Sequence, residues 1–130
     1  FLAFALGCID RTVESITSAL AIFGQRGLYQ KPYSLEWIRD WSGKKIYIHQ
    51  PEPPQQILEP AHAEAINSVL RKIPARRCAA YGYKQIPHSW GKTGTTNDAR
   101  NIWFCGGTPQ SITGVYLGRD DNKPLSKQVL

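Results

Sequence analysis

Residues 89–118 constrain the fold most, because short runs rich in threonine and aromatic residues alternate there with turn residues. The runs cover about 89–96, 101–107 and 111–118, and Thr108-Pro109-Gln110 lies between the last two. β-Branched and aromatic runs separated by turns are typical of consecutive antiparallel strands. We therefore predict a three-stranded antiparallel meander in this part of the chain.

An amphipathic helix is predicted near the start of the chain. Thr12 suits an N-cap, and Glu14 in the first turn complements the positive end of the helix dipole. Gly24 and Gly27 are expected to end the helix. The apolar side chains recur at helical spacing: Val13, Ile16, Leu20 and Phe23.

The middle of the chain reads as a hairpin followed by a second helix. LEWIR (35–39) and KIYIH (45–49) flank the turn at 40–44, and PEPPQ (51–55) reads as a rigid extended connector. The second helix follows Pro60, and Pro74 is expected to end it. Its apolar stripe comprises Ala65, Ile66, Val69, Leu70 and Ile73, and residues 75–88 read as a loop.

Helix, hairpin, helix and meander in this order indicate a mixed α/β fold of the α+β type, with helices packed on an antiparallel sheet. The 130 residues suffice for one domain. The apolar run FLAFALGCI is too short to cross a membrane. Because the chain lacks Met and opens on Phe1, we expect it to be a piece of a longer protein.

The net charge and the cysteines limit the possible partners but do not identify one. The net charge of +6 favours acidic partners: nucleic acid, anionic lipid or carboxylate-bearing substrates. Cys8, Cys78 and Cys105 have no zinc-type spacing and are expected to act as small buried hydrophobic residues.

The stretch GKTGTT (91–96) has two interpretations. A phosphate-binding loop requires a glycine five residues before Gly91, where the chain has Ile86, and a helix straight after the loop. Threonine and glycine disfavour that helix. The alternative is the Lys-Thr-Gly strand of serine acyl-transferases that react with penicillin. On a strand, Lys92 and Gly94 would share one face, and Thr93 and Thr95 the other.

The longer stretch SWGKTGTTNDARNIWFCGGTPQSITGVYLGRDDNKPL (89–125) closely resembles the C-terminal motif region of class A penicillin-binding proteins. Two earlier segments agree: GQRGLYQKPYSLEWI (24–38) and LEPAHAEAINSVLRKI (58–73). The resemblance covers nearly the whole chain. Trp90, where the family usually has Ala, and Gly107, in place of a tyrosine, depart from the pattern.

The resemblance implies part of a peptidoglycan DD-transpeptidase fold, shared with serine β-lactamases. Residues 1–130 would form the C-terminal portion of that domain. The catalytic motif falls on Lys92, Thr93, Gly94 and Thr95. The hydroxyl of Thr95 would bind the substrate carboxylate, and the backbone N–H of Thr95 would complete the oxyanion hole. The substrate-binding residues would be Thr93, Thr95 and Thr96.

The same family uses a nucleophilic serine in an S-x-x-K motif at a helix start, and an S-x-N motif. Ser42-Gly43-Lys44-Lys45 matches S-x-x-K by letters, but the hairpin signals place it in a turn, so we reject it. No S-x-N triplet exists in the chain. We therefore expect this chain to be inactive alone and to need the remainder of the transpeptidase domain.

The implied partners are peptidoglycan stem peptides and β-lactam antibiotics, with no cofactor, metal or nucleic acid and no membrane contact from this segment. The intact protein would be anchored in the cytoplasmic membrane with its catalytic domains outside, and a glycosyltransferase domain would lie upstream. The alternative function is a non-catalytic module that binds the cell wall or a protein. The upstream sequence would distinguish the two.

Other charged and aromatic residues are interpreted as structural. The basic cluster at the end of the second helix reads as a solvated surface, the histidines as surface residues, the tryptophans as packing residues and the Asp pair as a turn. These residues are Arg71, Lys72, Arg76 and Arg77; His49, His62 and His88; Trp37, Trp41 and Trp103; Asp120 and Asp121.

Overall fold

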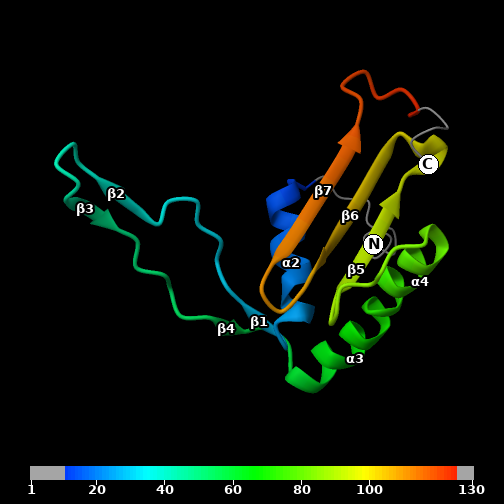
Figure 1. The fold of residues 1–130 in the computed structure, drawn as a ribbon, viewed down its shortest axis with the longest axis horizontal. Helices are drawn as coiled ribbons and strands as arrows, with labels where there is room; N and C mark the ends of the chain where they lie inside the picture. The colour runs from blue at the N-terminus through cyan, green and yellow to red at the C-terminus, as the bar shows by residue number, and fades with distance from the viewer. Residues whose placement is uncertain (1–10, 126–130) are drawn as a thin grey trace, which may run out of the picture.

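The computed structural model describes residues 11–125, so Cys8 lies outside the described residues. The chain forms a three-stranded sheet with helices around it, a short two-stranded pair and a long projecting hairpin (Figure 1). The elements are α2 (Val13–Gly24), β1 (Leu28–Tyr29), β2 (Trp37–Arg39), β3 (Lys45–Ile48), β4 (Gln55–Gln56), α3 (Pro60–Leu70), α4 (Lys72–Tyr81), β5 (Trp90–Thr95), the short 3-10 helix η1 (Asn97–Ala99), β6 (Asn101–Gly107) and β7 (Ile112–Gly118).

The sheet is the predicted antiparallel meander, with strand order β5-β6-β7. Lys92 lies opposite Cys105, and Gly94 lies opposite Trp103. The Thr108 N–H donates to the Ser111 carbonyl across the predicted turn between β6 and β7, at 2.8 Å. The α+β arrangement and the three strands are therefore confirmed.

Helix α2 packs across one face of this sheet, against β6 and β7 (Figure 1). Thr12 is the predicted N-cap, because its side chain accepts a hydrogen bond from the Ser15 N–H at 3.1 Å. Gly114 allows the close approach: a Cβ there would lie 1.9 Å from the Thr17 hydroxyl oxygen. The sequence thus predicts the helix, and a glycine in β7 makes its position on the sheet possible.

The prediction that Pro74 ends the second helix and that residues 75–88 form a loop is wrong. Helix α4 runs from Lys72 to Tyr81 and contains Pro74 in its first turn. Proline is tolerated there because the first N–H groups of a helix have no intrahelical acceptor. Gly82, at φ +70°, ends the helix in the left-handed conformation. The basic cluster is exposed to solvent, as predicted, but it lies at the start and middle of α4.

The buried face of α3 also differs from the predicted stripe. Ala63, Asn67 and Leu70 are buried, whereas Ile66 and Val69 are exposed within residues 11–125. Helical spacing fits both sets, because each follows a period near 3.6 residues. The periodicity therefore predicts the helix correctly but not the side that packs against α2 and β5.

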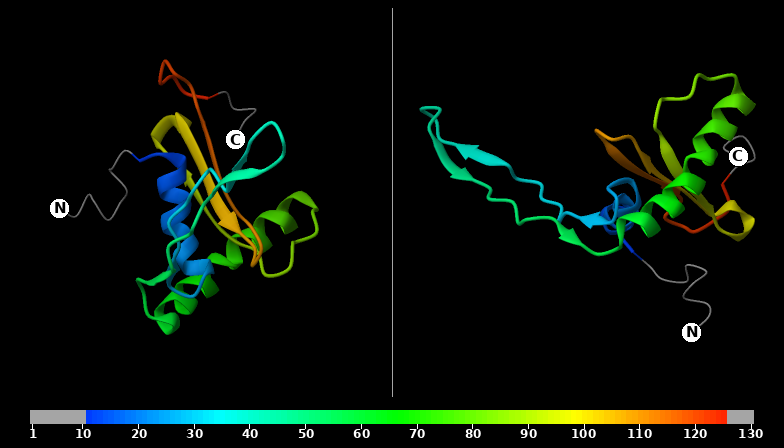
Figure 2. Two further views of the ribbon diagram at one scale, coloured as in Figure 1. Left: turned by 90° about the vertical axis from the view of Figure 1, so that its left-hand side faces the viewer. Right: turned by 90° about the horizontal axis from the view of Figure 1, so that it is seen from below.

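Strands β2 and β3 form the predicted hairpin, which projects far from the sheet (Figure 2). Its tip carries Trp41, which is 99% exposed, so the prediction that Trp41 is a packing residue is wrong. At the base of the hairpin, His49 stacks on Tyr33 with ring centroids 4.1 Å apart. The predicted connector at 51–55 ends in β4, which pairs with β1 and closes the base of the hairpin arm.

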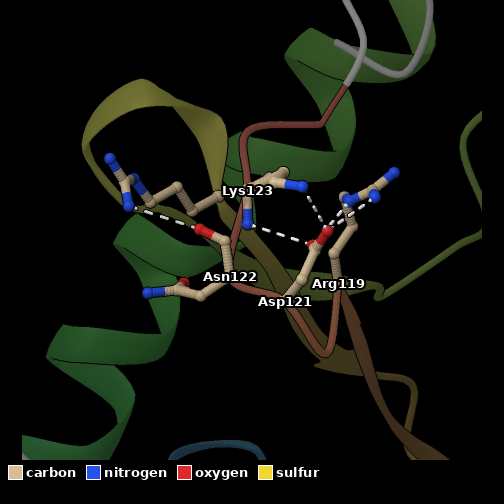
Figure 3. A network of polar contacts seen from close by, with 5 residues as sticks. Arg119, Asp121, Asn122 and Lys123 are labelled. Atoms are coloured by element: carbon tan, nitrogen blue, oxygen red, sulfur yellow. Dashed lines mark hydrogen bonds and ion pairs between the residues drawn. The ribbon is translucent and has the colours of Figure 1, made fainter.

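The C-terminal turn is built around one carboxylate (Figure 3). Asp121 accepts two hydrogen bonds of 2.8 Å from the Arg119 guanidinium and one of 3.3 Å from the Lys123 N–H. Arg119 holds the pKa of this carboxyl well below its usual range. Asp120 and Asp121 therefore form the predicted turn.

Two searches over residues 11–125 gave negative results. No helix there is long and apolar enough to cross a membrane. No group of three or more His, Cys, Asp or Glu side chains there is placed to hold a metal ion.

Candidate functional site

A cleft of about 560 Å³ opens between helix α2 and the face of the sheet that carries Lys92. It brings together residues from the start of α2 and from all three strands. The lining residues are Arg11, Thr12, Val13, Ile16, Leu20, Lys92, Thr93, Gly94, Thr96, Asn101, Trp103, Cys105 and Tyr116. Three residues of the Lys-Thr-Gly motif therefore line one cleft.

Strand alternation places Lys92 toward the cleft. Lys92 lies opposite Cys105 in the antiparallel pair, and residues directly opposite each other point to the same face. Cys105 is buried and lines the cleft beneath α2. Gly94, two residues beyond Lys92, leaves the adjacent part of the same face without a side chain.

Strand β5 is an edge strand, and no strand among the described residues pairs with its outer side. The Thr96 N–H donates inward to the Asn101 carbonyl at 3.0 Å. Because N–H and C=O groups alternate in direction along an antiparallel strand, those of Thr93 and Thr95 point to the free edge. The Lys92 ammonium donates to the Thr93 carbonyl, which agrees with this direction.

The two threonines after the motif have different positions. Thr96 lines the cleft, whereas Thr95 does not, although both are exposed. Thr96 lies just beyond the end of β5, and its hydroxyl accepts a hydrogen bond from the Asn101 N–H at 2.9 Å. Strict alternation turns the Thr95 side chain away from the Lys92 face, and what Thr95 offers to a ligand is its backbone N–H at the strand edge.

Positively charged residues line the cleft. Lys92 and Arg11 are among the lining residues, as is the N-terminus of α2. The first N–H groups of a helix and its dipole favour an anion at that end. The cleft is therefore suited to a ligand that carries a carboxylate.

Several cleft residues were not identified as functional from the sequence. Trp103 and Tyr116 form a tilted aromatic pair with centroids 4.9 Å apart, and the Tyr116 hydroxyl donates to the Asn101 side chain at 2.6 Å. Once β5 and β6 are paired, Trp103 lies opposite Gly94. Alternation of side chains along the two strands could therefore have identified Trp103 as a cleft residue. Nothing in the sequence indicates that the start of α2 forms the opposite wall.

Two serine–lysine pairs match S-x-x-K by letters, and neither lies at a helix start. Ser42 is in the hairpin turn, where its hydroxyl donates to Asp40 at 2.7 Å. Ser89 and Lys92 form the second pair, which was not predicted. Ser89 immediately precedes β5, and an odd spacing along an extended chain places its side chain on the face opposite Lys92. Neither serine is therefore positioned beside Lys92.

Unusual residues around the motif are accommodated by their neighbours. Trp90 is buried against α2, where a Cβ at Gly24 would lie 2.5 Å from the indole. Gly107 leaves no room for a side chain, because a Cβ there would lie 2.6 Å from the Ser111 carbonyl oxygen. Burial raises the pKa of the Cys105 thiol, so Cys105 behaves as the predicted buried hydrophobic residue.

Comparison with curated proteins gives one consistent set of relatives. The chain is 31% identical to penicillin-binding protein 1A of Rickettsia bellii and 30% identical to that of Aquifex aeolicus, over 97% and 99% of its own length. It is 32% identical to penicillin-binding protein 1A of Neisseria lactamica. It spans only 16–19% of the length of these relatives. No family model matches the chain.

Solved structures show the same fold. Penicillin-binding protein 1A from Haemophilus influenzae superposes with a TM-score of 0.82 at 24% identity, covering 96% of this chain and 25% of that one. PBPA from Mycobacterium tuberculosis superposes with a TM-score of 0.66 at 16% identity, over 85% of this chain and 27% of that one. The predicted resemblance is therefore confirmed, and the chain is related over nearly all of its length to one part of a penicillin-binding protein.

Proposed function

We propose that residues 1–130 form the C-terminal portion of a penicillin-binding transpeptidase domain and supply one wall of its active site. In the intact protein this site would cross-link peptidoglycan by acyl transfer from stem peptides that end in D-Ala-D-Ala. The observation that carries the proposal is the Lys-Thr-Gly motif on an edge strand, with Lys92 and Gly94 facing a cleft of about 560 Å³.

The free edge of β5 suits the acyl donor. An extended peptide can lie along an unpaired strand and exchange backbone hydrogen bonds with it. The outward N–H of Thr95 would then donate to the oxyanion that forms on the attacked carbonyl, and removal of one such donor costs about 10²–10³ in rate. Gly94 leaves space for the ligand beside the strand.

The charges of the cleft suit the terminal carboxylate of the donor. Lys92 and Arg11 border the same cleft as the N-terminus of α2. We assign substrate binding to Thr93, Thr95 and Thr96, as the motif implies, with Thr96 placed on the cleft side. Lys92 would also assist proton transfer at the reacting centre.

The reaction requires a serine that this chain does not place in the cleft. The serine oxygen would attack the carbonyl between the two D-alanines, forming an ester while the terminal D-alanine leaves with a proton. The amine of a neighbouring stem peptide would then attack the ester, form the cross-link and return the proton to the serine. An S-x-x-K helix and an S-x-N motif elsewhere in a longer protein would supply the missing groups.

The cellular setting is proposed from the resemblance to class A penicillin-binding proteins. The intact protein would be anchored in the cytoplasmic membrane, with the transpeptidase site on its outer side and a glycosyltransferase domain upstream. Its partners would be stem peptides, β-lactams and the remainder of the transpeptidase domain. No cofactor is required by the ester chemistry described above.

Covalent labelling of the full-length protein by a β-lactam tests the proposal. We expect an intact-mass adduct on a serine upstream of Phe1 and a labelling rate at least about 10²-fold lower in Lys92→Ala, because a proton-transfer group is lost. Lys72→Ala removes an exposed lysine from α4 and should label normally. An adduct on Ser42 would contradict the proposed site. Folded protein that forms no adduct would instead support a non-catalytic cell-wall or protein-binding module.

A further inference from the structure

The β2–β3 hairpin projects far from the sheet (Figure 2). Its turn carries Trp41, and no residue of the hairpin lines the cleft. Trp41 is 99% exposed, which leaves both faces of the indole open within the described structure. Isolated exposed tryptophans are costly to keep in water and are enriched where proteins bind partners. The proposed reaction does not use this residue.

The turn that carries Trp41 is closed by several hydrogen bonds. The Asp40 carboxylate accepts hydrogen bonds from the Ser42 N–H, the Ser42 hydroxyl and the Lys44 N–H, at 2.9, 2.7 and 3.0 Å. The Arg39 guanidinium donates to the Gly43 carbonyl at 3.1 Å. Trp41 is therefore held on an ordered turn, and binding through it would cost little additional ordering.

The hairpin also carries a net positive charge. Residues 37–48 contain three cations, Arg39, Lys44 and Lys45, and one carboxylate, Asp40, which gives +3 − 1 = +2. Asp40 is already engaged in the turn. Arg39 and Lys45 lie over the Trp37 ring at 4.9 and 5.7 Å from its centroid, which fixes two of the cations on one face of the hairpin.

The free backbone groups along β2 and β3 favour a partner that contains peptide groups over a lipid bilayer. β2 and β3 pair only with each other in the described part of the chain, so their outer N–H and C=O groups face solvent. Such groups cannot enter a bilayer without loss of hydrogen bonds. They can pair with the amides of an extended peptide. A polymer with sugar rings, peptide amides and carboxylates would match the indole, the edges and the cations together.

We infer that the hairpin tip, residues 39–45, is a docking element for an anionic glycopeptide polymer. Sugar C–H groups would stack on the Trp41 ring, and polymer carboxylates would lie near Lys44 and Lys45. The identification of this polymer as peptidoglycan rests on the proposed function. The hairpin would hold the polymer at a second point, remote from the site where its stem peptides react.

Cosedimentation of the full-length protein with purified, protein-free peptidoglycan sacculi tests the inference. We expect Trp41→Ala to weaken binding about tenfold, the effect of losing one central aromatic contact. Tyr83→Ala is the matched control, because Tyr83 is an exposed aromatic residue outside the hairpin. It should bind as the wild type does.

Two double variants, each of which removes two positive charges, provide a second test. Lys44→Gln/Lys45→Gln should weaken binding several-fold and make it less sensitive to salt, because fewer ionic contacts remain to be screened. Lys72→Gln/Arg76→Gln removes the same charge from α4 and should leave binding unchanged. The rate of β-lactam acylation, measured on every variant, tests the proposed function separately, because the hairpin does not border the cleft.

Two results would overturn the inference. One is wild-type affinity of Trp41→Ala for sacculi. The other is Trp41-dependent binding to vesicles of anionic phospholipid with none to sacculi, which would assign the tip to a membrane surface. Binding to sacculi tests the docking role of the hairpin whether or not the protein is acylated by a β-lactam.

Discussion

Single glycines in the sheet determine how closely α2 can approach it. A Cβ at Gly114 would lie 1.9 Å from the Thr17 hydroxyl oxygen and 3.1 Å from a Val13 methyl group. We expect Gly114→Ala to destabilise the intact protein by about 1–3 kcal/mol through overpacking, measured by thermal unfolding. Thr17→Ala in the same molecule should recover part of the loss, and additive effects of the two changes would contradict this account.

A second effect at this scale concerns acid stability. The folded pKa of Asp121 is lowered by the Arg119 hydrogen bonds, so its contribution is complete above the unfolded pKa of about 4 and disappears as pH falls through the folded value. Asp121→Asn should increase hydrogen exchange at the Lys123 amide near neutral pH. The difference from wild type should shrink at the lowest pH.

The neighbouring Asp120 is the control for that measurement. It forms no hydrogen bond or ion pair within residues 11–125, so Asp120→Asn should leave exchange at the Lys123 amide unchanged. Equal effects of the two substitutions would show that net charge, rather than the turn itself, controls opening.

The residue types of the candidate site could be predicted from the sequence, but not all of their positions. Alternation along a strand places Lys92 and Gly94 on one face without further information. Thr96 lies two residues beyond Gly94 and its backbone is still extended, so the same alternation places it on the cleft side, where the structure also has it. The contribution of Arg11 and Thr12 depends on how α2 crosses the sheet, which local sequence does not encode.

At the scale of elements, the position of Pro74 explains why α4 was not predicted. A proline ends a helix when it falls in the interior, but in the first turn it removes no hydrogen bond. We expect Pro74→Ala to change stability by less than about 1 kcal/mol, whereas Ala80→Pro near the C-terminal end should cost about 3 kcal/mol. Denaturant unfolding of the intact protein measures both. Tolerance of Ala80→Pro would mean that residues 75–81 are not helical.

The strands were predicted better than the pairing at the base of the arm. The meander has clear turn residues between β-branched runs, and the 40–44 turn has Asp and Gly in the required places. β1 and β4 have only two residues each and contain no such pattern. Their pairing depends on the chain returning to the sheet, so it could not be predicted from a local window.

At the scale of the whole molecule, burial is small for a chain of this length. Within the described part, the buried apolar residues are Ala21, Ala63, Leu70, Trp90 and Cys105. Large apolar side chains such as Ile66 and Val69 are exposed there. The chain also spans less than a fifth of the length of the curated relatives described above. These surfaces are available for contact with further parts of a longer protein.

The isolated 130-residue chain should therefore fail to unfold cooperatively. Folding has to offset about 1–2 kcal/mol of conformational entropy per residue, and so few buried apolar side chains contribute too little hydrophobic stabilisation. We expect a broad thermal transition, binding of a hydrophobic dye and no covalent labelling by penicillin, whereas the full-length protein should melt sharply and be labelled. A sharp, reversible melt of the isolated chain would show that its own core is sufficient. Penicillin labelling of that chain would further require a nucleophile among residues 1–130.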